Sequence, residues 1–200
     1  MTDAVLVGHS MGGAIVAEAA LAHPERVSGL VLVDAAGYGI RWPFMLKLAR
    51  WPIVGAVVDL FRGRATTARL LRQSYADPSR VTTQDIDQYY APMAEPGAGK
   101  ALRGVLREYR FDTLRSRIDS VAVPTLVMWG SEDRLIPITV GGALVAELQR
   151  GALVVVPRAG HALPEEAPET FNRSLIAFLQ HGLPTAPQDV AFTHSGAARD

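Results

Sequence analysis

The chain has 200 residues, of which 48% are hydrophobic and 20% are charged, a composition typical of a globular domain. Lys plus Arg and Asp plus Glu each number 20, so the chain lacks the basic excess of a general nucleic-acid-binding protein. The absence of cysteine excludes disulfides, a thiolate nucleophile and cysteine metal ligands. The apolar runs are too short for a membrane span or a signal peptide, so we expect a cytoplasmic protein.

Four uninterrupted apolar runs predict the strands of a parallel sheet. They cover residues 5–7, 30–33, 125–129 and 153–156, and such runs are typical of strands that are covered on both faces. Helices are expected over residues 12–23 and 138–148. A third helix is expected around Phe171, Leu175, Phe178 and Leu179, whose spacing places them on one helical face. The chain therefore has the strand–helix alternation of an α/β protein.

Residues 37–111 interrupt this alternation, since they contain no clear buried strand. We expect several helices there, broken by Pro43, Pro52, Pro78 and the stretch 92–99. Between residues 41 and 115, Lys and Arg number 13 against 7 Asp and Glu, which favours a solvated face over a site for an anionic substrate. The predicted organisation is a core in two parts, 1–36 and 112–182, a helical cap over 37–111 and a disordered tail over 183–200.

The sequence Gly8-His9-Ser10-Met11-Gly12 predicts a nucleophile elbow, because a strand precedes it and a helix follows it. In such a tight turn the residues two before and two after Ser10 nearly collide, and glycine at both positions removes the side chains. Ser10 is then expected in a strained conformation with its hydroxyl above the sheet. The backbone N–H of Met11, at the start of the helix, can bind an oxyanion.

A serine nucleophile needs a base, and His161 is the best candidate of the five histidines. It lies in Ala159-Gly160-His161-Ala162, on a loop that follows the fourth apolar run, and functional residues gather at the carboxyl ends of parallel strands. Successive strand residues face opposite ways, so His9 is expected to point away from Ser10. The remaining three are His23 at the far end of a helix and His181 and His194 in or near the tail.

The base in turn needs an acid to hold its tautomer, and Asp133 is the predicted one. It follows the third apolar run in Trp129-Gly130-Ser131-Glu132-Asp133, which gives the chain order Ser, Asp, His. Glu132 is adjacent, and Asp34 follows the second apolar run. Either could be the acid instead, although Asp34 also fits a turn residue.

The nucleophile segment LVGHSMGG, the acid segment PTLVMWGSEDRLIP and the base segment AGHALPEEAP resemble those of the α/β-hydrolase superfamily. The resemblance covers residues 3 to about 181 and is closest to the capped subgroup of esterases, lactonases and carbon–carbon bond hydrolases. It implies a partial α/β-hydrolase fold, with a parallel sheet flanked by helices and an inserted helical cap. Haloalkane dehalogenases and epoxide hydrolases have an aspartate where this chain has Ser10, which argues against both activities.

The same resemblance implies that strands precede the elbow and that a His-Gly loop supplies a second oxyanion N–H. Neither occurs before Ser10, so we expect this chain to be the C-terminal part of a hydrolase. The first strand would then have an unpaired edge through which the chain could self-associate. With Met11 alone as oxyanion donor, the expected hydrolysis is weak.

The expected activity is that of a serine hydrolase in which Ser10, His161 and Asp133 form a catalytic triad. It would cleave a small, largely apolar ester or related carbonyl compound through an acyl-enzyme, with Trp42 and Phe44 lining the acyl pocket. No metal or organic cofactor is implied, and the expected partner is the small-molecule substrate, without nucleic acid or membrane. Two alternatives stay open: a cofactor-free haloperoxidase-like enzyme, and an inactive fragment that acts as an interaction module.

Overall fold

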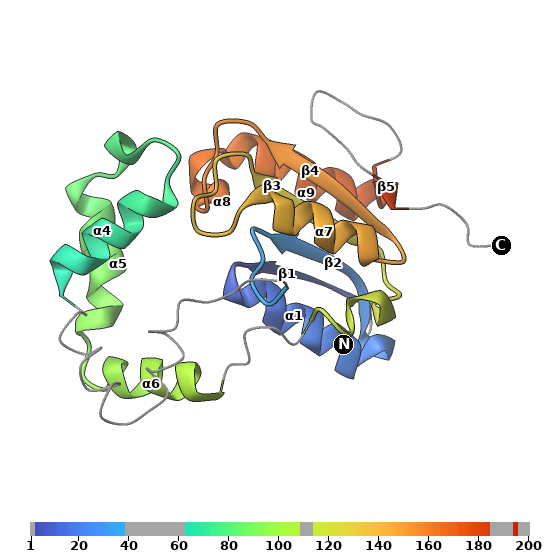
Figure 1. Ribbon diagram of the computed structural model, residues 1–200, viewed down its shortest axis with the longest axis horizontal. Coiled ribbons are helices and arrows are strands. Elements are labelled where there is room, and N and C mark those ends of the chain that lie inside the picture. The colour runs from blue at the N-terminus through green and yellow to red at the C-terminus, as the bar shows by residue number, and fades with distance from the viewer. Residues whose placement is uncertain (1–2, 39–62, 109–113, 185–193, 196–200) are drawn as a thin grey trace.

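A central sheet organises the chain. The computed structural model describes residues 3–38, 63–108, 114–184 and 194–195. Their strands are β1 (Ala4–His9), β2 (Val27–Val33), β3 (Thr125–Gly130), β4 (Gly151–Val156) and β5 (His194–Ser195). They lie in the order β1-β2-β3-β4-β5 (Figure 1), and β1 to β4 are parallel. Each of the four predicted apolar runs lies within one of these parallel strands, so the predicted parallel sheet is confirmed.

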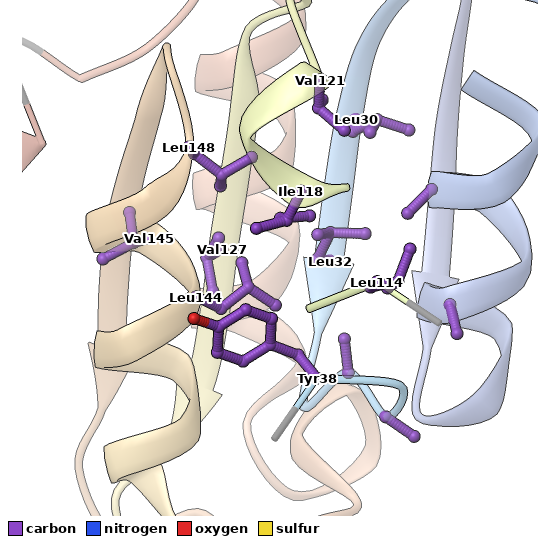
Figure 2. Close-up of a cluster of buried hydrophobic side chains, with 14 of the residues drawn as sticks. Leu30, Leu32, Tyr38, Leu114, Ile118, Val121, Val127, Leu144, Val145 and Leu148 are labelled. Carbon is purple, nitrogen blue, oxygen red and sulfur yellow. The ribbon is translucent and has the colours of Figure 1, made fainter. Parts of the chain in front are cut away.

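Helices cover both faces of the sheet, as the uninterrupted apolar runs predicted. Helices α1 (Met11–Ala22) and α7 (Ile138–Glu147) pack on one face, where Leu30, Leu32 and Val127 are fully buried. Figure 2 shows part of this layer, including Ile118 from the short 3-10 helix Ile118–Ser120 and Val121, which follows that helix. Helix α9 (Pro168–His181) covers the other face through Phe178, which packs in the cluster that contains Val31 and Met128.

β1 lies at one edge of the sheet. Its residues pair with β2 from Ala4 opposite Val27 to His9 opposite Val33, and no other strand of the described ranges pairs with it. This is the edge position expected from the sequence, and the self-association that it suggests stays a prediction. At the opposite edge, β5 pairs antiparallel with β4, within a stretch for which the sequence predicted no regular structure.

In its described part, residues 63–108, the segment predicted to be a helical cap contains three helices. They are α4 (Arg64–Ser74), α5 (Thr83–Ala94) and α6 (Ala98–Glu108), with the 3-10 helix Pro78–Arg80 between the first two. The helix break expected in the stretch 92–99 is present, because α5 ends at Ala94 and α6 begins at Ala98, and Pro92 lies inside α5, two residues before its end. Proline has no N–H to donate to the preceding turn, which favours the end of a helix soon after it. Pro43 and Pro52 lie outside the described residues.

Helices α4 and α5 pack on the loop that follows β4. The buried side chains of Leu71, Tyr75 and Ile86 form one cluster with Ala162 of that loop, and both helices lie beside α8 (Leu163–Glu166) in Figure 1. The segment is therefore attached to the carboxyl ends of the parallel strands. None of the helices within the described ranges is long and apolar enough to cross a membrane.

Candidate active site

Ser10 occupies a tight turn between β1 and α1. Its backbone has φ 52° and ψ −121°, a left-handed conformation that costs a non-glycine residue free energy and is typical of functional sites. Three backbone hydrogen bonds hold the turn: Ser10 N–H donates to Val33 O at 2.9 Å, and Ser10 O accepts from Gly13 and Ala36 at 3.0 and 2.9 Å. The predicted strained conformation is thus present.

The backbone approaches itself closely enough in this turn to require glycine at position 8, but not at position 12. A Cβ atom on Gly8 would lie 2.4 Å from the carbonyl oxygen of Gly12, whereas a Cβ on Gly12 would meet nothing within 4 Å. The sequence-based expectation that both glycines avoid a collision is therefore right for Gly8 and wrong for Gly12. Gly13 also allows close packing, since a Cβ atom on it would lie 2.5 Å from Cβ of Ala35.

Ser10, His161 and Asp133 form one continuous chain of hydrogen bonds. Oγ of Ser10 lies 2.9 Å from Nε2 of His161, and Nδ1 of His161 lies 2.7 Å from Oδ2 of Asp133. The ionised carboxylate of Asp133 can only accept, so Nδ1 carries the proton and Nε2 is free to accept from the serine hydroxyl. His161 and Asp133 are each 7% exposed, which shields these contacts from water.

The position of each partner follows from the strand that precedes it. Asp133 comes three residues after β3 and His161 five residues after β4, and the carboxyl ends of these parallel strands meet Ser10 at one edge of the sheet. The backbone N–H groups of Leu135 and Ile136 donate to Oδ1 of Asp133 at 2.8 and 2.9 Å. These two bonds fix the carboxylate and leave Oδ2 for His161.

The two other acids that the sequence left open have different surroundings. Glu132 is exposed. Asp34 is fully buried, and its Oδ1 accepts from the N–H of Gly130 at 2.8 Å. Its Oδ2 has no hydrogen-bond partner in the described part of the chain. Burial raises the pKa of Asp34, the hydrogen bond from Gly130 opposes this rise, and the negative charges of Asp133 and Glu166 add to it, so that the pKa is about 9.

His9 is closer to the site than its strand position predicted. Its Nε2 lies 2.6 Å from the backbone carbonyl oxygen of His161, and the two imidazole rings lie 4.9 Å apart. A carbonyl only accepts, so Nε2 of His9 is the donor. Burial lowers the pKa of His9, which favours the neutral ring. His23 and His181 are exposed at helix ends, and His194 lies in β5.

The N–H of Met11 lies at the N-terminus of α1, where no helical carbonyl can accept from it. This is the position predicted for an oxyanion donor. Trp42 and Phe44, predicted to line the acyl pocket, lie outside the described residues. In the described parts of the chain, no group of three or more His, Asp or Glu residues is arranged to hold a metal ion.

Two neighbouring acids that the sequence analysis did not single out connect the site to the helical segment. Glu165 accepts from the hydroxyl of Tyr75 at 2.7 Å and also from that of Tyr89. Glu166 is 7% exposed and accepts from two backbone N–H groups. The signal that could have found them is their place four and five residues after His161, in a short helix rich in acids.

Comparison with known proteins finds hydrolases of one family. A model of the alpha/beta hydrolase family matches residues 1–174. The uncharacterized hydrolase YugF of Bacillus subtilis (strain 168) is 32% identical over 179 residues, which cover 89% of this chain and 66% of that protein. A 2-hydroxy-6-oxononadienedioate/2-hydroxy-6-oxononatrienedioate hydrolase of Paraburkholderia xenovorans (strain LB400) is 30% identical over 190 residues, 88% of this chain and 62% of the relative.

Among solved structures, a meta-cleavage product hydrolase from Pseudomonas fluorescens IP01 superimposes with a TM-score of 0.74 and 26% identity. The match covers 90% of this chain and 66% of that structure. The chain thus spans just under two thirds of the length of these relatives. The matched family model, the parallel sheet between two helical layers and the similarity to these hydrolases together show that the chain belongs to the alpha/beta hydrolase family.

Proposed function

We propose that this chain carries the catalytic triad of a serine hydrolase, with Ser10 as nucleophile, His161 as general base and Asp133 as the acid that orients it. The observation that supports the proposal best is the continuous chain of contacts, 2.9 Å from Ser10 to His161 and 2.7 Å from His161 to Asp133. Both distances are those of strong hydrogen bonds. Three chance neighbours would not place a hydroxyl, an acceptor nitrogen and a carboxylate in this order.

The chemistry follows from that order. Ser10 attacks the substrate carbonyl while its hydroxyl proton moves to Nε2 of His161, and the carboxylate of Asp133 stabilises the imidazolium that forms. His161 then gives the proton to the leaving group, which departs from the acyl-enzyme. Water attacks this ester next, with His161 again taking and returning a proton, and the acid product leaves.

The negative oxygen that forms during both attacks needs hydrogen-bond donors. We assign the N–H of Met11 as one of them, because it is the first backbone donor of α1 and the helix dipole favours an anion there. Losing a single oxyanion donor slows acyl transfer on the order of a hundred- to a thousandfold. The Met11 N–H alone would therefore support slow turnover.

The substrate that we propose is a small, largely apolar ester or a related carbonyl compound. A relative named as a 2-hydroxy-6-oxononadienedioate/2-hydroxy-6-oxononatrienedioate hydrolase and one named as a pimeloyl-[acyl-carrier protein] methyl ester esterase support an ester or related carbonyl substrate. We predict that Trp42 and Phe44 line the acyl pocket. Replacing both with alanine should shift the preferred acyl-chain length of p-nitrophenyl esters more than it lowers the rate on the acetate. An unchanged chain-length profile would remove the two residues from the pocket.

Pre-steady-state kinetics with p-nitrophenyl acetate tests the reaction. An acyl-enzyme that forms faster than it hydrolyses releases a burst of nitrophenol, and the burst amplitude should approach one per chain. Ser10→Ala should abolish the burst and remove nearly all of the steady-state activity, a loss on the order of a millionfold for a complete enzyme. A Ser10→Ala variant that keeps more than a few per cent of the activity would refute the proposal, and a folded wild-type chain without any burst would favour the inactive interaction module.

A further inference from the structure

The loop that carries His161 is hydrogen-bonded to the end of α4. The N–H of Ala162 donates to the carbonyl oxygen of Ser74 at 3.1 Å. From the other direction, Arg80 donates to the backbone carbonyl oxygen of Glu166 at 3.0 Å. Ala162 and Glu166, one and five residues after His161, are therefore bonded to the end of α4 and to the 3-10 helix that follows it.

The side chain of Glu166 makes the most direct of these connections. Its Oε1 accepts from the N–H of Gly160 at 2.8 Å, and its Oε2 accepts from the N–H of Ala76 at 2.7 Å. One buried carboxylate thus bridges the residue before His161 and Ala76, which lies two residues after the end of α4. Hydrogen bonds from backbone N–H groups to a carboxylate are among the stronger ones in proteins.

Gly160 leaves no space between the two segments. A Cβ on this residue would lie 2.5 Å from the carbonyl oxygen of Ser74, 2.6 Å from the nitrogen of Ala76 and 2.9 Å from Oε1 of Glu166. The backbone before His161 is therefore in direct contact with the end of α4. Any slackening of the Glu166 bridge would let this backbone, and the imidazole attached to it, shift.

We propose that Glu166 is a positioning residue for His161: by bridging Gly160 and Ala76 it sets the place of the imidazole between Ser10 and Asp133. The inference rests on the triad under Proposed function. It follows that α4 helps to hold the catalytic base in place, in addition to any role that the helix has in a cap. A displacement of about 1 Å at a catalytic group can lower a rate about a hundredfold.

Only glutamate has both the two acceptor atoms and the side-chain length that the bridge requires. Both partners of the side chain are donors, so both of its terminal atoms must accept. Glutamine has one acceptor oxygen and would point an NH₂ group at an N–H. Aspartate keeps both acceptors and the charge but is one methylene shorter. Glu165 provides a matched control, because its partners are the hydroxyls of Tyr75 and Tyr89, which can also donate to or accept from an amide.

The test uses the 200-residue chain with Glu166→Gln, Glu166→Asp and Glu165→Gln. Rates with p-nitrophenyl acetate are divided by the number of Ser10 sites that a fluorophosphonate labels, so unfolded chains do not count. The proton on Nδ1 of His161 is followed by its low-field ¹H NMR signal, which reports the bond to Asp133 without any substrate. A thermal unfolding curve shows that each variant is folded.

For Glu166→Gln we expect kcat per labelled site to fall about 10- to 100-fold with KM changed less than about twofold. The His161 signal should broaden or disappear. Glu165→Gln should stay within about twofold of wild type, as for most surface substitutions. Should Glu166→Gln not fold, Glu166→Asp decides by the same two measurements.

Folded Glu166 variants with an unchanged kcat per site and an unchanged His161 signal would overturn the inference. An equal loss in Glu165→Gln would also overturn it, since the effect would then be one of general loop stability. If the wild type shows no esterase burst but the His161 signal responds to Glu166→Gln and not to Glu165→Gln, the proposed function fails and the positioning role stands.

Discussion

Two neighbouring turns, one after β2 and one after β3, each place a buried aspartate at the same edge of the sheet. Asp34 after β2 is fully buried and Asp133 after β3 is 7% exposed. Asp133 has three partners, the N–H groups of Leu135 and Ile136 and the ring of His161. Among the residues that the structure describes, Asp34 has one, the N–H of Gly130. Similar burial thus accompanies very different hydrogen bonding.

The difference suggests that the number of hydrogen-bond donors, more than the extent of burial, decides whether a buried carboxylate is ionised. With one donor against the cost of burial, the pKa of Asp34 rises to about 9, so this group holds its proton at neutral pH. A protonated carboxyl cannot stabilise an imidazolium. Asp133, with two backbone donors on one oxygen, has its other oxygen directed at His161, which is what an orienting acid requires.

Replacing each aspartate in turn with asparagine should give the largest difference in kcat between the two sites. Asp133→Asn should lower kcat about 10⁴-fold, because the amide donates to Nδ1 and forces the proton onto Nε2, where it blocks the serine. Asp34→Asn should cost less than about tenfold, since a neutral amide resembles the protonated acid and can still accept from Gly130. Steady-state kinetics on p-nitrophenyl acetate measures both. The reverse ranking would make Asp34 the orienting acid.

The pH dependence of stability tests the proton on Asp34. Its folded pKa of about 9 is above the ordinary value of 3.8, so between these values the folded state binds a proton that the unfolded state has lost. The contribution is fully present below pH 3.8 and is lost as the pH rises to about 9. Relative to wild type, Asp34→Asn should gain on the order of 1 kcal/mol in free energy of unfolding for each pH unit in this window.

Urea unfolding of both proteins at pH 5, 7 and 9 gives this comparison. Parallel stability curves for wild type and Asp34→Asn would mean that Asp34 is ionised in the folded protein. In that case the different numbers of hydrogen-bond partners would not give Asp34 and Asp133 different charges.

The contact between His9 and the backbone of His161 should give the smallest effect. His9→Phe keeps the ring but removes the donor to the carbonyl of His161, a loss of about 1 kcal/mol or about fivefold in kcat. His23→Gln, at an exposed helix end, serves as the matched control and should leave kcat unchanged. If His9→Phe equals the control, the triad does not depend on support from β1.

Much of this site could be predicted because its residues follow local patterns. The Gly8-x-Ser10 turn between an apolar run and a helix specifies the elbow, and one loop residue after each later strand indicates Asp133 and His161. The apolar runs located the four parallel strands for the same reason, since burial on both faces leaves a continuous signal.

The features that were missed depend on contacts between distant segments. Nothing around Glu166 indicates that its carboxylate meets Ala76, 90 residues earlier. A strand pattern of period two also does not predict the turn geometry that brings His9 into contact with His161. The sequence favoured Asp133 and left Asp34 open, because both follow buried strands, and it did not indicate the hydrogen bonds in which the two differ.

Covalent labelling by a fluorophosphonate tests the central claim most directly, because it needs an activated serine and no knowledge of the substrate. The label should map by peptide mass spectrometry to Ser10, at close to one per folded chain. Labelling should vanish in Ser10→Ala, slow strongly in Asp133→Asn and remain near the wild-type rate in Asp34→Asn. A folded chain that is not labelled, or one labelled equally fast with Asp133→Asn, would contradict the assignment of Ser10, His161 and Asp133 as one catalytic unit.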